Sequence, residues 1–450
     1  MQRENDFTKG KILMPLLRFM LPVFFAMFLQ SMYGAVDLMI VGKFGQAADV
    51  SAVSTGSQIM MTLANLVTSF AMGPTILLGR KIGEGKAGEA GEVIGSSICL
   101  FGVIALALTS FVPVSAAALS RIMHAPAEAF PETVSYIRIC GFGSVFINAY
   151  NLIGSIFRGI GDSKTPLVTV MIACVFNIAG DLLMVAGFHL GAGGAATATA
   201  AAQAISVVIS LALMRHRKLP FQIKKNDLRF QSSIIGQVTM LGLPIALQDF
   251  LVGVSFLVLL GIVNSLGLIA SAGVGVAEKV CAFIMLIPVA FMQAMAAFVA
   301  QNIGARRYDR AKKALLYAIG VSTAIAVVMF AVTFWHGDLL SGIFANDILV
   351  IQASAEYLKA YAIDCLLTCF MFCFTGFFNG LGMTRFVMIQ GIIGAFCVRI
   401  PVAFLMSREV PVSMFHMGLA TPCATVVQVI MYLVCFSIVD KRRKKFRHCT

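Results

Sequence analysis

A carboxylate stands in the middle of an apolar stretch near the start of the chain. Residues 19–41 read FMLPVFFAMFLQSMYGAVDLMIV, and Asp37 is the one charged side chain among them. An aspartate at the centre of a membrane-spanning helix costs roughly 2.5–3.5 kcal/mol on insertion scales, so such a residue is typical of an ion, proton or substrate site. Gln30 and Tyr33 precede it by seven and four residues, which places them on the same helix face. The stretch is a candidate ion-coupling site, and Pro22 within it allows the helix to bend.

A second acid lies in a later apolar stretch. Asp181 follows Asn177 by four residues, so both side chains share a helix face. With Asp37 they predict an oxygen-rich cluster for H⁺ or Na⁺, because oxygen ligands suit a hard cation. Two neighbouring carboxylates in a low-dielectric setting favour holding a proton. Thr199 completes the cluster with its hydroxyl or instead bonds to its own helix. With Na⁺ as the coupling ion, the metal ligands would be Asp37, Asp181 and Asn177.

Other side chains within the apolar stretches are candidates for a substrate cavity. The acids and amides among them would meet a cationic compound, and the methionines would line an adaptable apolar pocket. Their alternatives are helix–helix bonding for the asparagines and plain packing for the methionines. We expect Arg399 to neutralise a buried acid rather than to bind substrate. The cavity candidates are Asn148, Asn151, Gln248, Asp249, Met285, Met292 and Asp364.

Composition determines the kind of element that must hold these residues. The 450 residues are 59% hydrophobic and only 12% charged, with a mean hydropathy of +0.90. A soluble protein of this size carries more charge. The apolar runs are long enough to cross a bilayer as helices and lack the alternation of barrel strands. We predict an all-α integral membrane protein with twelve transmembrane helices, near 13–41, 50–78, 93–117, 135–157, 166–187, 194–214, 234–262, 271–300, 314–335, 353–378, 386–406 and 415–437.

The positive charges predict the orientation of the chain. The net charge is +13, and nearly all Lys and Arg fall in segments on the N-terminal side of the predicted helices. The opposite segments carry only Lys43, Arg121 and Arg408. This bias predicts that both termini lie in the cytoplasm and that the protein sits in the cell (plasma or inner) membrane. The basic tail is expected to touch anionic lipid, and we expect no nucleic-acid partner.

The chain also repeats itself. At an offset of 221 residues, RKIGEGK (80–86) matches QNIGARR (301–307), and IFRGIGDSK (156–164) matches FFNGLGMTR (377–385). Each half holds six predicted spans, so the halves enter the membrane in the same direction, related by a pseudo-twofold axis along the membrane normal. The predicted domains are an N-lobe at 1–214, a basic cytoplasmic linker at 215–233, a C-lobe at 234–440 and the tail at 441–450.

The two predicted lobes differ in their chemistry. At the repeat offset, Leu259 stands where the first half has Asp37, and Val402 stands where it has Asp181. The first half therefore keeps intramembrane acids where the second has aliphatic side chains. This asymmetry favours ion coupling in the first lobe.

Signals of an enzyme are weak. The segment GEGKAGE (83–89) lacks the GK[ST] ending of a phosphate loop, and no strand precedes it. The six histidines are scattered, and no Gly-x-Ser-x-Gly motif occurs. We therefore expect no enzyme activity and no cofactor beyond the coupling ion. Transport would be driven by an ion gradient.

These features together resemble a known family of transporters. The chain resembles the multidrug and toxic compound extrusion (MATE) family over nearly its whole length. The resemblance is carried by the two six-helix halves, the pattern Pro22–Gln30–Tyr33–Asp37, VGKFG (41–45), FRGIGDSKTP (157–166), Asn177–Asp181 and GAATAT (194–199). It implies antiport, in which small amphipathic, often cationic compounds leave the cytoplasm as H⁺ or Na⁺ enters.

The resemblance also implies roles for individual residues. In the DinF-like and archaeal members the helix-one aspartate, here Asp37, is the coupling residue, and Asn177, Asp181 and Thr199 join its network. The helix is proposed to bend at Pro22. The NorM-like branch instead carries acids on helices seven and ten, where this chain has Val252 and Thr368 by register. Asp249 and Asp364 lie about one turn earlier, so the NorM-like roles are not carried over to them.

Two other functions fit a membrane protein of this kind. A lipid-linked precursor or oligosaccharide flippase of related architecture would line its cavity with several Arg or Lys to meet phosphates. Within the spans only Arg399, and towards their ends Arg18 and Lys279, are available. A non-transport subunit of a membrane complex would copurify with partners, whereas we expect a monomer in the lipid bilayer.

Overall fold

The computed structural model describes residues 7–216 and 224–447 of the chain. These residues form helices and connecting turns, with no strand among them. Eleven helices are long and apolar enough to cross a membrane, and the count rises to twelve when the bent pair Phe130–Phe142 and Ser144–Gly159, which meet at 48°, forms one span. The predicted all-α fold with twelve transmembrane helices is confirmed.

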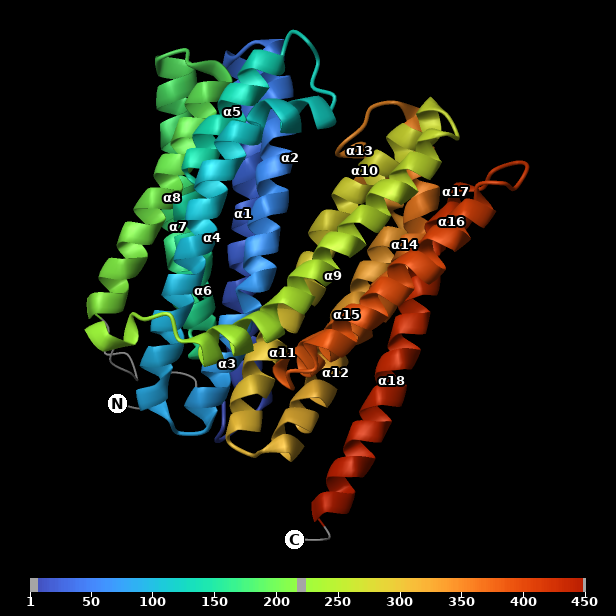
Figure 1. The fold of residues 1–450 in the computed structure, drawn as a ribbon. Helices are drawn as coiled ribbons and strands as arrows, with labels where there is room; N and C mark the ends of the chain where they lie inside the picture. The colour runs from blue at the N-terminus through green and yellow to red at the C-terminus, as the bar shows by residue number, and fades with distance from the viewer. Residues whose placement is uncertain (1–6, 217–223, 448–450) are drawn as a thin grey trace. The chain divides into compact units, whose positions relative to one another are not determined.

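The helices of the first half follow one another through short turns (Figure 1). Its spans are built from α1 (Leu13–Phe44), α2 (Ala47–Phe70), α3 (Met72–Gly83), α4 (Ala87–Ile122), α5 (Phe130–Phe142), α6 (Ser144–Gly159), α7 (Lys164–Asp181) with the π-helix η1 (Leu182–Gly187), and α8 (Gly191–His216).

The second half follows the same plan after a short 3₁₀ turn, η2 (Lys225–Asp227). Its elements are α9 (Ser232–Asn264), α10 (Leu268–Ile284), α11 (Leu286–Gly304), α12 (Tyr308–Trp335), α13 (Gly337–Gly342), α14 (Ile348–Gly380), α15 (Thr384–Ile392) with the π-helix η3 (Ile393–Arg399), α16 (Ile400–Met406), α17 (Met414–Gly418) and α18 (Ala420–Arg447).

Contacts divide the chain into two compact units. The first unit comprises Met1–Ala246 and Ala300–Arg307, and the second comprises Leu247–Val299 and Tyr308–Thr450. The division falls within α9 and near the end of α11, so the first unit includes a short piece of the second half.

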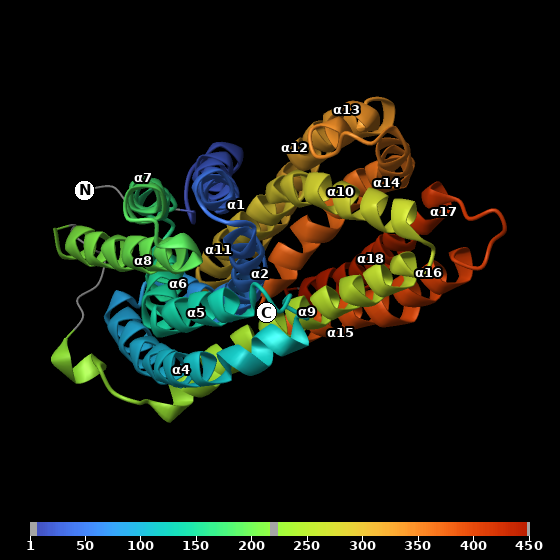
Figure 2. The same cartoon turned by 90° about the horizontal axis from the view of Figure 1, so that it is seen from above.

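Within the first unit, α7 lies beside both α1 and α8 (Figure 2). Small side chains make this packing close, since a Cβ placed on Gly180 of α7 would lie 2.9 Å from the Cβ of Ala198 on α8. Small residues at a helix interface let the two backbones approach. The alanine-rich stretch of α8 therefore brings the end of α7 against the neighbouring helix at the level of Asp181.

Within the second unit, α14 is the central helix and packs against α10, α12 and α18. Tyr432 of α18 is fully buried and stacks on Phe374 and Phe378 of α14 at 5.9 and 5.5 Å between ring centroids. Its hydroxyl lies 2.8 Å from the hydroxyl of Thr375 and accepts a hydrogen bond from the side-chain amide of Gln390 at 2.6 Å. Stacking and hydrogen bonds together fix α14 to α15 and α18.

The repeated GIGDSK and GLGMTR segments form the same turn in the two halves. Gly161 has φ +87° and Gly382 has φ +74°, a left-handed backbone that glycine adopts without steric cost. In the first half the Asp162 carboxylate then accepts hydrogen bonds from the amides of Lys164 and Thr165, at 2.9 and 3.0 Å, and caps the start of α7. The second half has Met383 there, whose thioether cannot replace that carboxylate.

The other repeated segment makes a reciprocal contact in the first unit. A Cβ on Gly83, at the end of α3, would lie 2.0 Å from the carbonyl oxygen of Gln301. A Cβ on Gly304, at the end of α11, would lie 2.1 Å from the carbonyl oxygen of Arg80. Gly304 is the repeat equivalent of Gly83, and Gln301 is that of Arg80. The two helix ends thus contact each other through the same positions, and both glycines are needed for the approach.

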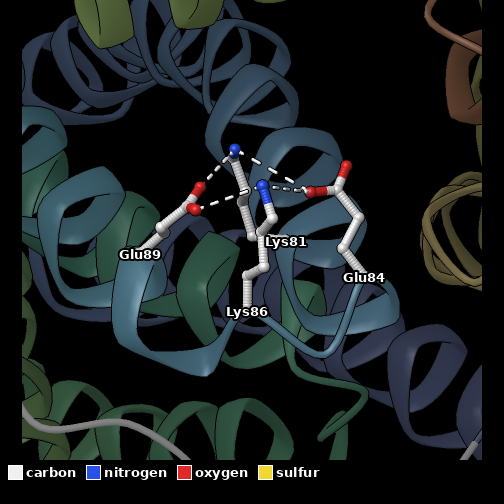
Figure 3. Close-up of polar contacts among 4 residues, drawn as sticks. All are labelled: Lys81, Glu84, Lys86 and Glu89. Carbon is white, nitrogen blue, oxygen red and sulfur yellow. Dashed lines mark hydrogen bonds and ion pairs between the residues drawn. The ribbon is translucent and has the colours of Figure 1, made fainter.

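Four charged side chains close the turn between α3 and α4 (Figure 3). The Lys81 ammonium lies 2.6 Å from Glu89 and 3.9 Å from Glu84, and Lys86 lies 3.2 Å from Glu89 and 3.8 Å from Glu84. Exposed pairs of this kind are worth little individually. Both lysines of the GEGK segment are thus paired with acids of the same turn.

Candidate functional site

The candidate site lies between α1 and α7 in the first unit. Asp37 sits on α1 with 5% of its surface exposed, and Asp181 is the last residue of α7 with 0% exposed. The two carboxyl groups interact across the α1–α7 contact. The π-helix η1 begins directly after Asp181, and such bulges inside helices are frequent at functional sites. The structure therefore brings together two buried acids that lie far apart in the sequence.

Asn177 and Thr199 extend the cluster. The Asn177 amide donates to the Thr199 hydroxyl at 3.4 Å, and that hydroxyl donates to Oδ2 of Asp37 at 3.4 Å. Asn177 is almost fully buried, while Thr199 on α8 is half-buried. The four predicted members of the ion-coupling cluster thus lie together on α1, α7 and α8.

Several oxygens of this cluster lack a donor. Within the described part of the chain, Oδ1 of Asp37, both carboxylate oxygens of Asp181 and Oδ1 of Asn177 are buried and have no hydrogen-bond partner. A buried polar atom without a partner is costly, most of all on a charged group. An H⁺ shared by the carboxyls, or a cation bound among the oxygens, would remove this cost. The donor set fits H⁺ or Na⁺, and the described residues hold no group of three or more His, Cys, Asp or Glu suited to another metal ion.

The remaining helix-one predictions have different outcomes. Gln30 lies two turns from Asp37 and donates to the hydroxyl of Tyr150 on α6 at 3.2 Å, rather than to the cluster. The side chain of Tyr33 lies outside the described part of the structure. Pro22 lies inside α1, where it removes one backbone hydrogen bond. As parts of the coupling machinery, all three remain predictions.

The two asparagines of α6 bond mainly to their own helix. Asn148 donates to the carbonyl of Ser144 and Asn151 to that of Ile147, each at 2.9 Å. Asn151 also accepts from the Thr68 hydroxyl at 2.7 Å and so ties α6 to α2. These bonds agree with the structural alternative, and substrate contact by either asparagine stays a prediction.

The cavity candidates of the second half are scattered over several helices. On α9, Gln248 lies against Gly391 of α15, where a Cβ would be 2.8 Å from the glutamine side chain, and Asp249 is exposed. Met285 packs against a buried cluster that includes Val280 and Tyr361. Met292 of α11 is half-buried. No measured contact joins these residues to substrate, so their cavity role remains a prediction.

A second buried charged group was only partly anticipated from sequence. Asp364 of α14 is 1% exposed and interacts with Arg399, which is 6% exposed at the end of η3. The expectation that Arg399 meets a buried acid agrees with this arrangement. Its partner could not be identified from spacing, because the two residues lie 35 positions apart on different helices.

Comparison with known proteins connects these features to a family. A family model described as MatE matches residues 22–183 and again residues 244–405, in agreement with the internal repeat. The chain is 24% identical over 433 residues to the "Probable multidrug resistance protein YoeA" of Bacillus subtilis, covering 95% of this chain and 94% of that protein. It is also 24% identical over 436 residues to the "Multidrug export protein MepA" of Staphylococcus saprophyticus, covering 95% of each.

A solved structure shares the fold. The chain superimposes on a structure described as "Crystal structure of MATE in complex with MaL6" with a TM-score of 0.92, covering 99% of this chain and 100% of the other. Their sequences are 18% identical, so this likeness concerns the fold.

Proposed function

Because the chain belongs to the MatE family of multidrug efflux transporters, we propose that it exports small amphipathic, often cationic compounds in exchange for H⁺ or Na⁺ taken up at Asp37 and Asp181. Members of this family are transporters rather than enzymes and need no cofactor. The protein is a multi-pass membrane protein. We propose that it works as a monomer in the cell membrane, with both termini in the cytoplasm.

The observation that carries the proposal is the set of buried oxygens without donors around Asp37. Two carboxyl groups interact at the α1–α7 contact, and three of their four oxygens have no hydrogen-bond partner in the described residues. A site that is complete without a cation would supply donors from the protein. This one leaves room for a proton or a Na⁺, whose charge would compensate the carboxylates.

The position of the cluster suggests how cation uptake reaches the rest of the unit. Asp37 belongs to α1 and Asp181 to α7, so a bound cation draws the two helices together, and its loss leaves two acids in mutual repulsion. Pro22 lies fifteen residues before Asp37 in α1 and weakens the helix there. We propose that α1 bends at Pro22 when the cluster changes its charge, and that this bend alters the affinity for substrate. Differential affinity between the two states is what couples one flux to the other.

The test uses the purified protein in proteoliposomes loaded with a fluorescent lipophilic cation. A pH gradient and a Na⁺ gradient are imposed in turn, and the rate of probe movement is recorded. Wild type should move the probe under at least one gradient, and the effective gradient identifies the coupling ion. Asp37→Asn and Asp181→Asn should each abolish gradient-driven movement while the protein still inserts.

A matched control is Asp338→Asn, which neutralises an exposed acid on α13 and should leave transport unchanged. Full gradient-driven transport by Asp37→Asn would remove that residue from the mechanism. An absence of movement with wild type, for a panel of lipophilic cations and both gradients, would contradict cation-coupled export of this substrate class.

A further inference from the structure

Arg399 is held at a fixed place inside the second unit. Its guanidinium donates through Nη1 to the hydroxyl of Ser255 on α9 at 2.9 Å. Its Cζ lies 4.1 Å from the ring centroid of Phe256, close enough for a cation–π interaction. The side chain is 6% exposed, and its Nε has no hydrogen-bond partner among the described residues. A neutral hydroxyl and an aromatic ring orient this charge but do not neutralise it.

Asp364 is the acid that faces this charge. It lies on α14 with 1% of its surface exposed and interacts with Arg399 and with Thr425 of α18. Its Oδ1 has no hydrogen-bond partner in the part of the chain that the structure describes. Each of the two charges is therefore incompletely satisfied by neutral groups. Removal of one member of such a buried pair leaves the other uncompensated, at a cost larger than the net contribution of the pair.

We infer that the guanidinium of Arg399 takes, in the second unit, the place that a coupling cation takes in the first. It compensates Asp364 permanently, so this acid neither takes up H⁺ nor binds Na⁺ during transport. The inference rests on the proposed function in assigning cation uptake to Asp37 and Asp181. Its consequence is that the transporter has one exchangeable cation site, although each unit contains a deeply buried aspartate.

The repeat shows that this pair was built in the second half alone. At an offset of 221 residues, Arg399 corresponds to Ile178 and Asp364 to Gly143. The first half thus has an aliphatic side chain and a glycine where the second has a base and an acid. The two halves carry different buried charges on the same framework, with a free acid pair in one and a compensated pair in the other.

Other ionisable groups surround the pair. From α14 they are Tyr357, Tyr361 and Cys365, and from α10 they are Glu278 and Cys281. From α9 and α18 the neighbours are Ser255, Phe256 and Thr425, which carry no charge. Glu278 interacts with Tyr357 and Cys281. It therefore serves as a matched acid for distinguishing a specific pairing from a general effect of charge.

The experiment measures thermal unfolding of the detergent-purified full-length protein between pH 6 and pH 8, with and without Na⁺. Arg399→Met removes the charge and keeps a long apolar side chain. Its melting temperature should fall by about 5 °C or more at pH 8 and partly recover at pH 6 or with Na⁺, because the uncompensated carboxylate then finds a proton or a cation. Adding Asp364→Asn to Arg399→Met should restore the pH 8 melting temperature and remove the new pH and Na⁺ dependence.

Two further variants complete the test. Arg399→Lys keeps the charge and should stay free of the new pH dependence, whereas Glu278→Gln combined with Arg399→Met should restore nothing. If Arg399→Met does not accumulate, recovery of expression in the Asp364→Asn, Arg399→Met double variant reports the same pairing. A double variant no more stable or abundant than Arg399→Met alone would overturn the inference.

The readout separates this inference from the proposed function. Unfolding needs no transport, so it reports on the pair even in a protein that exports nothing. Asp37→Asn should leave the pairing of Arg399 with Asp364 intact, as shown by an unchanged effect of Arg399→Met in that background. A loss of that effect in the Asp37→Asn background would contradict the independence of the two sites.

Discussion

Thr199 donates its hydroxyl to Oδ2 of Asp37 at 3.4 Å, and the same hydroxyl accepts the amide of Asn177. The hydroxyl therefore relays a hydrogen bond from α7 to α1, while it belongs to α8. One oxygen of Asp37 has this donor, and the other has none among the described residues. Thr199 thus orients the carboxylate and leaves one of its oxygens available to a cation.

The first prediction concerns this hydroxyl. Thr199→Ala removes the donor to Asp37, and one neutral hydrogen bond contributes about 0.5–1.5 kcal/mol. We expect the apparent affinity for the coupling cation to fall by about 3- to 10-fold, with the maximal transport rate retained at a saturating cation concentration. The measurement is the rate of probe efflux as a function of pH or Na⁺ concentration in proteoliposomes.

Thr197→Ala is the control, because this threonine lies one position beyond its neighbour on α8 and bonds only to its own helix, at the carbonyl of Gly193. It should leave the cation dependence unchanged, and Thr199→Ser should restore most of the affinity. Equal effects of the alanine variants at 197 and 199 would contradict a specific role for Thr199.

The second prediction concerns the turn before α8. Asp49 accepts hydrogen bonds from the amides of Gln46 and Ala192, both at 2.9 Å, and so joins the start of α2 to the start of α8. Asp49→Ala leaves both amides without this acceptor, and we expect a loss of about 1–2 kcal/mol in stability. The melting temperature of the purified protein should fall while the cation dependence of transport stays the same.

Asp49→Asn keeps one carbonyl oxygen and should lose less stability than Asp49→Ala. Gly191→Ala should be more harmful, since its Cβ would lie 2.2 Å from the Asp49 carboxylate and φ is +53°. An Asp49→Ala variant as stable as wild type would show that the two hydrogen bonds contribute nothing to the fold.

The third prediction concerns the contact between Gly83 and Gly304. A Cβ at either position would overlap a carbonyl oxygen of the other helix end, so Gly83→Ala and Gly304→Ala must separate α3 from α11. Overpacking of this kind costs typically about 1–3 kcal/mol. We expect lower stability for both, by similar amounts, measured by thermal unfolding.

Gly88→Ala is the matched control for these variants, because nothing lies within 4 Å of its added Cβ. It lies in α4, where alanine is favoured over glycine by about 1 kcal/mol, so its stability should be unchanged or raised. If Gly304→Ala proved as stable as Gly88→Ala, the close approach of the two helix ends would have no energetic role.

The fourth prediction concerns the polar contact inside the second unit. Tyr432→Phe keeps the aromatic stacking on Phe374 and Phe378 but removes the hydroxyl shared by Thr375 and Gln390. Leaving buried polar partners unsatisfied costs about 1–3 kcal/mol. The melting temperature should fall with little change in cation affinity. A variant with wild-type stability would show that Thr375 and Gln390 find other partners.

The global fold could be predicted from sequence because it follows from simple quantities. Apolar length determines the spans, and the repeat offset determines that the two halves share one plan. The four-residue spacing of Asn177 and Asp181 placed them on one face, and the structure brings them to Asp37 and Thr199.

Other features could not be predicted, for physical reasons. Gln30 shares a helix face with Asp37, but seven residues span two helical turns, so it bonds to Tyr150 instead. The π-helix after Asp181 depends on packing and leaves no local signal in the sequence. The pairing of Asp364 with Arg399 depends on how α14 and η3 approach, which spacing along one helix cannot reveal.

The contact of Gly83 with Gln301, and of Gly304 with Arg80, has a historical consequence. Two identical chains related by a twofold axis touch in this way, each residue of one meeting the partner position of the other. One chain that contacts itself by the same rule retains the interface of a homodimer whose subunits were later joined by gene fusion. The six-helix ancestor was then selected for this close glycine contact before its two copies acquired different buried charges.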